Sequence, residues 1–161
     1  MRHLKILAVS ITSRQIGLVC LHRGVLVDWA VSYAAAKSEN TLVGYLQEWI
    51  NQQRPDVIVT EKCGPYCRKG KRSQNRMAAA AELASYNPPL DIAIVRPQPY
   101  PTKQIEAETL GRRYPELAGY VPSRKRRFFD PEPRGMGLFE ALILAEKVAY
   151  GPPGLLAKAM G

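Results

Sequence analysis

Apolar residues change their spacing along the chain, and this spacing predicts which segments are strands and which are helices. Three apolar runs rich in branched residues follow one another with short turns between them, at 4–10, 15–21 and 25–33. Such runs predict three consecutive strands joined as a meander. From residue 41 the apolar positions recur every three to four residues, which is typical of one face of a helix. Asn40 is the predicted N-cap of this helix, and Pro55 ends it.

The rest of the chain alternates between buried strands and helices. The predicted strands lie at 56–61 and 92–95, and the predicted helices at 73–86, 102–113 and 136–150. Ser73 is the expected cap of the second helix, and Glu146 and Lys147 are expected on the outer face of the last one. The proline-rich segment 114–135 is expected to form an ordered but irregular crossing, which Phe128 and Phe129 pin to the body of the protein.

This order of elements predicts an α/β fold in a single domain that covers residues 1–161. The expected architecture is a mixed five-stranded sheet, in which a three-strand meander is followed by βα units, with helices on both faces. Composition agrees, because 46% hydrophobic and 23% charged residues are typical of a soluble globular domain and not of a disordered or fibrous chain. No apolar run approaches the roughly 18 residues of a membrane span, so no membrane partner is expected.

The three cysteines, Cys20, Cys63 and Cys67, bear on the cellular compartment. Their odd number and the absence of a signal-like N-terminus predict free thiols in a reducing cytosol, and hence a cytoplasmic location. A zinc site built on Cys63 and Cys67 is the less favoured alternative, because no second pair of ligands lies nearby in the sequence.

Charge is the first indication of a partner. Lys and Arg outnumber Asp and Glu by 23 to 14, and the net charge of +9 indicates an anionic partner. Residues 62–81 contain no acid, and their cations are Lys62, Arg68, Lys69, Lys71, Arg72 and Arg76. A second basic run comprises Arg124, Lys125, Arg126 and Arg127. Both runs are expected to be exposed, and contact with nucleic-acid phosphates is favoured over the alternative of solvated loops.

Three short segments carry a resemblance to a known family. They are residues 6–17, the strand 56–61 that ends in Glu61, and residues 137–142 with the sequence Gly-Leu-Phe-Glu-Ala-Leu. Together with the element order, they resemble the ribonuclease H-like superfamily, in particular RuvC-type Holliday-junction resolvases and YqgF-like proteins. In that family the first strand ends in an aspartate, the fourth in a glutamate, and the final helix carries an Asp-x-x-Asp-Ala-Leu pattern. Here Ser10 stands at the first position, Glu61 matches the second, Gly137 replaces the first helix acid and Glu140 retains the second.

The resemblance implies two-metal phosphodiester hydrolysis, with Ser10, Glu61 and Glu140 at the catalytic positions. In this chemistry carboxylates hold two magnesium ions roughly 4 Å apart. A neutral Ser10 hydroxyl cannot replace a bridging carboxylate, so Glu61 and Glu140 are left as metal ligands and only weak Mg²⁺ binding is expected. Other acids that could complete the site are Glu106, Glu108, Asp130 and Glu132. The alternatives are a lone surface acid at Glu61 and a solvated residue at Glu140.

These observations favour a nucleic-acid-binding protein of the resolvase type whose metal-dependent nuclease activity is reduced or absent. Its expected partner is DNA or RNA, with branched DNA and a homodimer implied by the resemblance. A first alternative is an active, magnesium-dependent, structure-specific endonuclease that uses Glu61, Glu140 and one further acid. A second is a protein-interaction module whose basic loops meet an acidic partner. A third, an ATP-binding relative, is disfavoured because such proteins need two domains of this kind.

Overall fold

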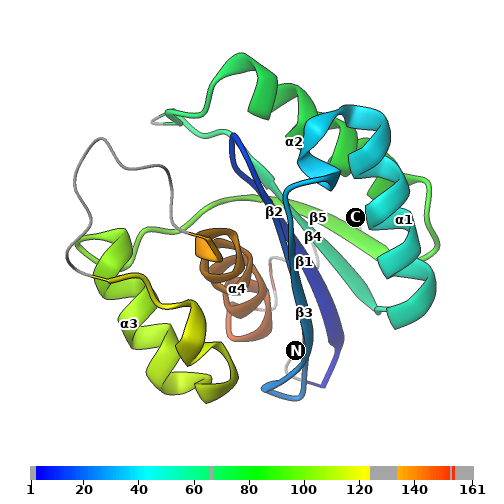
Figure 1. Ribbon diagram of the computed structural model, residues 1–161. Coiled ribbons are helices and arrows are strands. Elements are labelled where there is room, and N and C mark those ends of the chain that lie inside the picture. The colour runs from blue at the N-terminus through cyan, green and yellow to red at the C-terminus, as the bar shows by residue number, and fades with distance from the viewer. Residues whose placement is uncertain (1–2, 66, 124–133, 153, 155–161) are drawn as a thin grey trace.

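A five-stranded mixed sheet forms the centre of the molecule in the computed structural model, which describes residues 3–65, 67–123, 134–152 and 154 (Figure 1). Its strands are β1 (Lys5–Ile11), β2 (Ile16–His22), β3 (Val25–Ser32), β4 (Val57–Lys62) and β5 (Leu90–Val95). They lie in the order β3-β2-β1-β4-β5. The first three form an antiparallel meander, and β4 and β5 run parallel to β1. The predicted mixed sheet is therefore confirmed.

Helices cover both faces of this sheet, as the sequence predicted. On one face lie α1 (Glu39–Gln53) and α2 (Lys71–Ser85), and across the other lies α4 (Met136–Ala149) (Figure 1). The remaining helix, α3 (Lys103–Arg113), packs against α4 on the side away from the sheet. The described residues also contain two short 3-10 helices: η1 (Ala35–Lys37) precedes α1, and η2 (Pro115–Tyr120) packs on α3.

The two faces of the sheet carry separate apolar cores, because successive side chains of a strand point to opposite sides. On the α4 face, Ala8 and Val59 belong to the core that includes the apolar residues of α4, whereas Leu7 and Ile58 pack with α1 and α2. Since α4 lies between the sheet and α3, nearly all of its residues are buried, and Glu140 is only 1% exposed. The alternative of Glu140 as a solvated residue is therefore wrong.

The helix starts show where local sequence misled the prediction. The N-cap of α1 is Ser38 and not Asn40, because Ser38 and Thr41 cap each other: each side-chain oxygen accepts from the other's backbone N–H at 3.1 Å. Helix α2 begins at Lys71 after Gly70, so Ser73 is a buried residue of the first turn and not a cap. Thr102 caps α3 by accepting from the Ile105 N–H at 3.1 Å.

The start of α4 lies directly on β2, through two glycines. A Cβ atom on Gly17 would overlap the carbonyl oxygen of Gly137 and would come within 2.8 Å of the Leu138 nitrogen. Gln15 strengthens this contact, since its Oε1 accepts from the Gly137 N–H at 3.0 Å and so satisfies a donor at the helix start that has no partner within the helix. The close approach fixes the first turn of α4 over the β1–β2 hairpin.

The prediction of three free thiols is wrong, because Cys63 and Cys67 form a disulfide in the loop after β4. Two cysteines with a separation of four residues reach each other here because the chain turns between them, with the Cys67 N–H donating to the Gly64 carbonyl at 3.1 Å. Cys20 is free and buried. The thiol count therefore no longer supports a cytoplasmic location, which stays a prediction.

Thiol titration is expected to give a different count in each of three states. Folded, oxidised protein should react slowly or not at all, because burial raises the pKa of the Cys20 thiol to about 11. Unfolding should expose one thiol per chain without reductant and three after reduction. The measurement is a colorimetric thiol assay at pH 8 in urea, with and without reductant. Three reactive thiols in unfolded, unreduced protein would contradict the disulfide.

Two further predictions concern membrane-spanning helices and the segment 114–135, and the described residues cover them only in part. Within the ranges given above, no helix is long and apolar enough to cross a membrane. The segment 114–135 contains η2, whereas Phe128, Phe129 and the whole basic run 124–127 lie outside the described residues.

Candidate functional site

Three of the predicted residues come together where β1 and β4 end. The parallel register pairs Ala8 with Val59, and the same register continued by two residues places Ser10 beside Glu61 on the α4 face. From α4, Glu140 reaches the same place, and its Oε2 accepts a long hydrogen bond of 3.5 Å from the Ser10 hydroxyl. All three side chains are buried, at 0%, 8% and 1% exposure for Ser10, Glu61 and Glu140. Their catalytic and metal-binding roles stay predictions.

Lys69, in the basic loop between β4 and α2, forms an ion pair with the Glu61 carboxylate. Lys69 Nζ lies 2.8 Å from Glu61 Oε1 and also donates to the Ile11 carbonyl at 2.5 Å. Its side chain is only 19% exposed, so Lys69 turns back into the protein and does not extend outward with its neighbours. The expectation that this cation is exposed is therefore wrong, because the buried carboxylate at the end of β4 draws it inward.

An arginine performs the same role for two other acids. Arg96 follows β5 directly, and its Nη2 lies 2.5 Å from Glu106 Oε1 while its Nε lies 3.5 Å from Glu140 Oε1. Lys103, the first residue of α3, approaches the same Glu140 oxygen at 3.4 Å. We call Ser10, Glu61, Lys69, Arg96, Lys103, Glu106 and Glu140 together the sheet-edge cluster.

Arg96 and Lys103 stand in no motif of the sequence and were not among the predicted site residues. A signal was present for Arg96, because it comes directly after a buried strand parallel to β4, and Val95 pairs with Lys62. Parallel strands present their carboxyl ends at the same edge of a sheet, where ligand sites are commonly built. For Lys103 the sequence shows only the first residue of a helix.

Charge within the sheet-edge cluster is balanced internally. Each of the three carboxylates has a lysine or arginine within 4 Å, and Ser10 is neutral. Burial raises the pKa of Glu106 above its usual value, although Arg96 lowers it in part, so Glu106 takes up a proton at higher pH than an exposed glutamate.

The residues present do not fit the two magnesium ions that the resemblance implied. Magnesium needs anionic oxygens that are available to it, whereas these carboxylates are ion-paired, and Ser10 offers only a hydroxyl where the resemblance implies a bridging carboxylate. Across the described part of the chain, no three or more His, Cys, Asp or Glu residues are grouped so that they could hold a metal. Of the other acids considered, Glu106 joins the cluster, Glu108 accepts from Gln104, and Asp130 and Glu132 lie outside the described residues.

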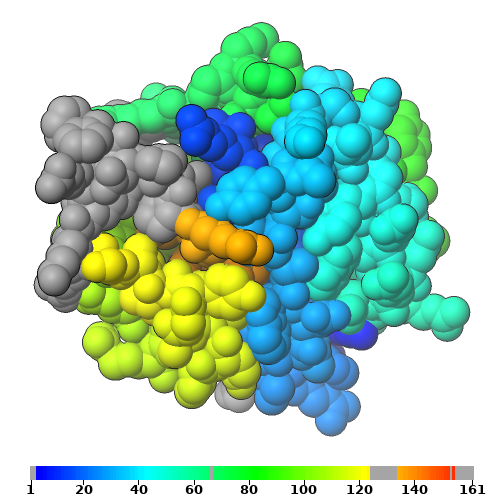
Figure 2. Space-filling model, viewed as in Figure 1, coloured from blue at the N-terminus to red at the C-terminus, as the bar shows by residue number. Residues whose placement is uncertain are grey.

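The cations of the basic segment 62–76, which runs from the end of β4 into α2, are exposed beside this edge except at Lys69 and Arg76. Exposed side chains belong to Lys62, Arg68, Lys71 and Arg72. Arg76 is buried at 4% exposure, so the prediction that it is exposed is wrong. It lies on the inner side of α2 and donates to the Lys37 carbonyl of η1 at 3.1 Å. In the space-filling view, the β1–β2 turn in dark blue lies beside α2 in green, above the start of α4 in orange (Figure 2).

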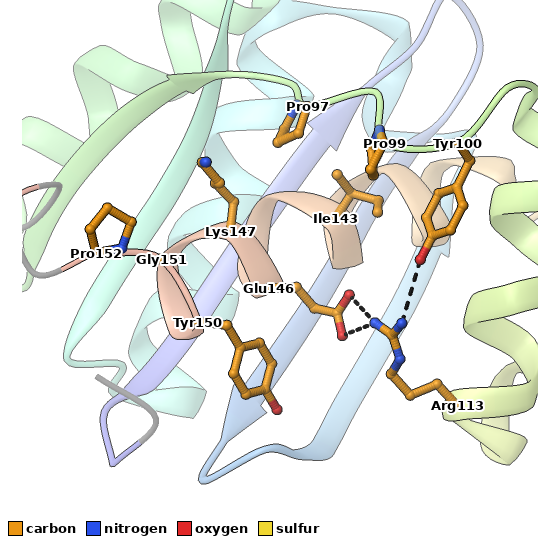
Figure 3. A pocket seen from close by; sticks show the side chains of 10 residues that line it. All are labelled: Pro97, Pro99, Tyr100, Arg113, Ile143, Glu146, Lys147, Tyr150, Gly151 and Pro152. Atoms are coloured by element: carbon orange, nitrogen blue, oxygen red, sulfur yellow. Dashed lines mark hydrogen bonds and ion pairs between the residues drawn. The ribbon is translucent and has the colours of Figure 1, made fainter.

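A pocket of about 540 Å³ lies elsewhere, between the β5–α3 connection, α3 and the end of α4 (Figure 3). Here Glu146 accepts from Arg113 through both carboxylate oxygens at 2.7 Å and from the Tyr114 hydroxyl at 2.8 Å. The prediction of Glu146 as an outward residue is therefore wrong. Burial and the bond to Glu146 raise the pKa of Tyr114 far above its usual value. Neither Ser10 nor Glu61 lines this pocket.

No protein-family model and no curated protein matches the chain. Its structure is similar to that of Thermus thermophilus RuvC, with a TM-score of 0.55 and 16% sequence identity over 94% of this chain and 97% of RuvC. It is also similar to the fowlpox virus resolvase in complex with Holliday junction DNA, with a TM-score of 0.60 and 12% identity over 91% of this chain and 97% of the resolvase. T. thermophilus RuvC in complex with a Holliday junction substrate gives 0.55 and 14%, over 92% of this chain and 97% of that one.

These likenesses, together with the strand order, establish the fold. The chain has a ribonuclease H-like α/β fold of the kind found in RuvC and the poxvirus resolvase. This confirms the fold class predicted from the sequence.

Proposed function

We propose that this protein binds nucleic acid, with four-way DNA as the favoured ligand, and does not cleave it by a two-metal mechanism. The observation that carries the proposal is the pairing of Glu61 with Lys69 and of Glu140 with Arg96 and Lys103. Two of the similar structures are complexes with Holliday junction DNA, and the net charge of +9 suits the same class of ligand.

Cleavage is disfavoured because of what a metal ion would have to displace. To bind at Glu61 or Glu140, a divalent cation must separate the carboxylate from a lysine or arginine that is itself largely buried, in the cases of Lys69 and Arg96. The displaced cation would then lie unpaired beside another positive charge, and uncompensated buried charges are strongly destabilising. Ser10 offers no negative charge in return.

Binding is supported by the exposed cations of the basic loop, which leaves the sheet at Lys62 and therefore begins beside the sheet-edge cluster. A phosphate backbone that follows this edge would meet Lys62 first and then Arg68, Lys71 and Arg72. Such contacts set affinity and not sequence preference, since phosphates carry no sequence information. The homodimer implied by the resemblance stays a prediction.

The proposal predicts junction binding without magnesium-dependent nicking. Wild-type protein should bind a labelled four-way junction in EDTA, and neither Mg²⁺ nor Mn²⁺ should produce nicks on a denaturing gel. The same metals should leave its melting temperature unchanged, because a ligand that does not bind the folded state does not stabilise it.

The matched variant is Ser10→Asp, which restores a carboxylate beside Glu140. Its melting temperature should fall in EDTA, because a buried charge is added beside like charges, and should recover partly in magnesium. Robust magnesium-dependent nicking by wild-type protein would overturn the proposal in favour of an active endonuclease. No binding to any DNA even at low salt would favour the protein-interaction module.

A further inference from the structure

We propose that Lys69, Arg96 and Lys103 take over the charge of the missing metal ions, so that the sheet-edge cluster holds a nucleic-acid phosphate without any divalent cation. This inference rests on the proposed function and adds the chemistry of the site to it. Under this proposal Glu61, Glu106 and Glu140 position the three cations instead of binding metal.

The three cations come from three separate elements and converge on one place. Lys69 arrives from the loop between β4 and α2, Arg96 from the end of β5, and Lys103 from the first turn of α3. Arg96 and Lys103 both approach one oxygen of Glu140, and the Ser10 hydroxyl donates to the other. The register of β1 and β4, continued by two residues, places Ser10 beside Glu61. A phosphate at this end of the sheet would therefore meet cations from three elements.

Glu140 holds its partners loosely, which distinguishes it from the other two acids. The contacts that Lys69 makes to Glu61 and Arg96 makes to Glu106 are 2.8 and 2.5 Å long, as expected of charge-assisted hydrogen bonds. Around Glu140 the corresponding distances are 3.4 Å to Lys103, 3.5 Å to Arg96 and 3.5 Å to Ser10. A carboxylate that is 1% exposed normally has closer partners, and the long distance leaves the Arg96 Nε donor without a hydrogen bond.

Arg96 has a buried hydrogen-bond donor that is not used within the described residues. Its Nε is buried and has no hydrogen-bond partner among the described residues, while its Nη2 is held by Glu106. The 3.5 Å separation of this Nε from Glu140 Oε1 is an ion-pair distance without a hydrogen bond, and a phosphate oxygen is an acceptor that suits the guanidinium in charge and geometry. The Arg96 side chain is 8% exposed and is thus fixed in place before any ligand arrives.

The start of α3 favours the same ligand. Lys103 is the first residue of an eleven-residue helix, whose N-terminal N–H groups carry partial positive charge. Its side chain is 53% exposed, so it is the cation of the three that solvent and a phosphate reach most easily.

Opposite substitutions in one ion pair test the proposal. The measurement is fluorescence anisotropy of a labelled synthetic four-way junction in EDTA, at a fixed salt concentration near 100 mM. Lys69→Gln should weaken binding about 5- to 10-fold, because one charged contact to phosphate is lost. Glu61→Gln should instead strengthen it about 3- to 5-fold, because Lys69 is released from its carboxylate. A merely structural ion pair would lower affinity in both variants.

Two further variants keep the test independent of folding defects. Lys103→Gln alters a half-exposed side chain and should also weaken metal-free binding about 5-fold, whereas Lys147→Gln, an exposed lysine near the end of α4, should have no effect. Wild-type binding that requires magnesium, or equal effects of Lys103→Gln and Lys147→Gln, would overturn the inference while the binding function stands. Absence of wild-type binding in both EDTA and magnesium would overturn the proposed function and the inference together.

Discussion

Replacing Gly17 with alanine is expected to lower the free energy of unfolding by about 3 kcal/mol or more, which is at the upper end for added volume in a packed interior. The new Cβ would overlap the Gly137 carbonyl oxygen and approach the Leu138 nitrogen to 2.8 Å. Both are backbone atoms of the first turn of α4, so the clash cannot be relieved by rotating a side chain. Urea unfolding followed by circular dichroism measures the effect.

Gly44→Ala is the matched control, because it adds the same methyl group where there is open space. Gly44 lies within α1, and a Cβ atom there would meet nothing within 4 Å. Alanine is the better helix former, so this variant should be more stable by about 0.5 to 1 kcal/mol. Equal stability of the two variants would show that β2 and α4 do not approach each other as closely as described.

The same contact leaves little room for a side chain at position 137. A Cβ atom on Gly137 would lie 3.1 Å from Gln15 Oε1 and 3.2 Å from the Gly17 nitrogen, closer than most Cβ atoms tolerate. A side chain at this position would therefore require the Gln15 side chain and the Gly17 backbone to give way slightly.

Most of the fold could be predicted because its signals are local and repeated. Every predicted strand and helix is present with ends within a few residues, since apolar spacing reports which face is buried. The caps were less accessible to prediction. Ser38 and Asn40 are both good capping residues, and only the reciprocal bonds with Thr41 decide between them.

The candidate site could be predicted only where a family pattern marked it. Ser10, Glu61 and Glu140 were found because each stands in a short motif, whereas Arg96 and Lys103 stand in none. Their importance comes from the register of β5 and from the return of α3 to the sheet edge. A linear run of cations likewise hides the difference between Lys69, which turns inward, and Arg68, which is exposed.

The exposed cations of the basic segment are expected to contact phosphates along the DNA. Changing Lys62, Arg68, Lys71 and Arg72 together to Gln should weaken DNA binding for all sequences. It should also flatten the slope of log affinity against log salt by up to about 3 to 4 units, since each neutralised phosphate contributes roughly 0.9 on duplex DNA. Lys69 is left unchanged, because its largely buried side chain belongs to the sheet-edge cluster and its contribution is measured separately with Lys69→Gln. Anisotropy with duplex, single-stranded and four-way DNA across a salt series measures the slope.

Arg23→Gln combined with Arg54→Gln is the control for a general loss of positive charge. Both arginines are exposed, and they lie at the opposite end of the sheet, in the β2–β3 turn and just before β4. If phosphates follow the carboxyl edge, this pair should leave the slope nearly unchanged, because contacts and not net charge release counterions. An equal loss of slope per charge in both variants would mean that DNA is attracted by the whole basic surface. An unchanged slope in the four-residue variant would make the loop a solvated face, and phosphate contact would then have to come from the sheet-edge cations alone.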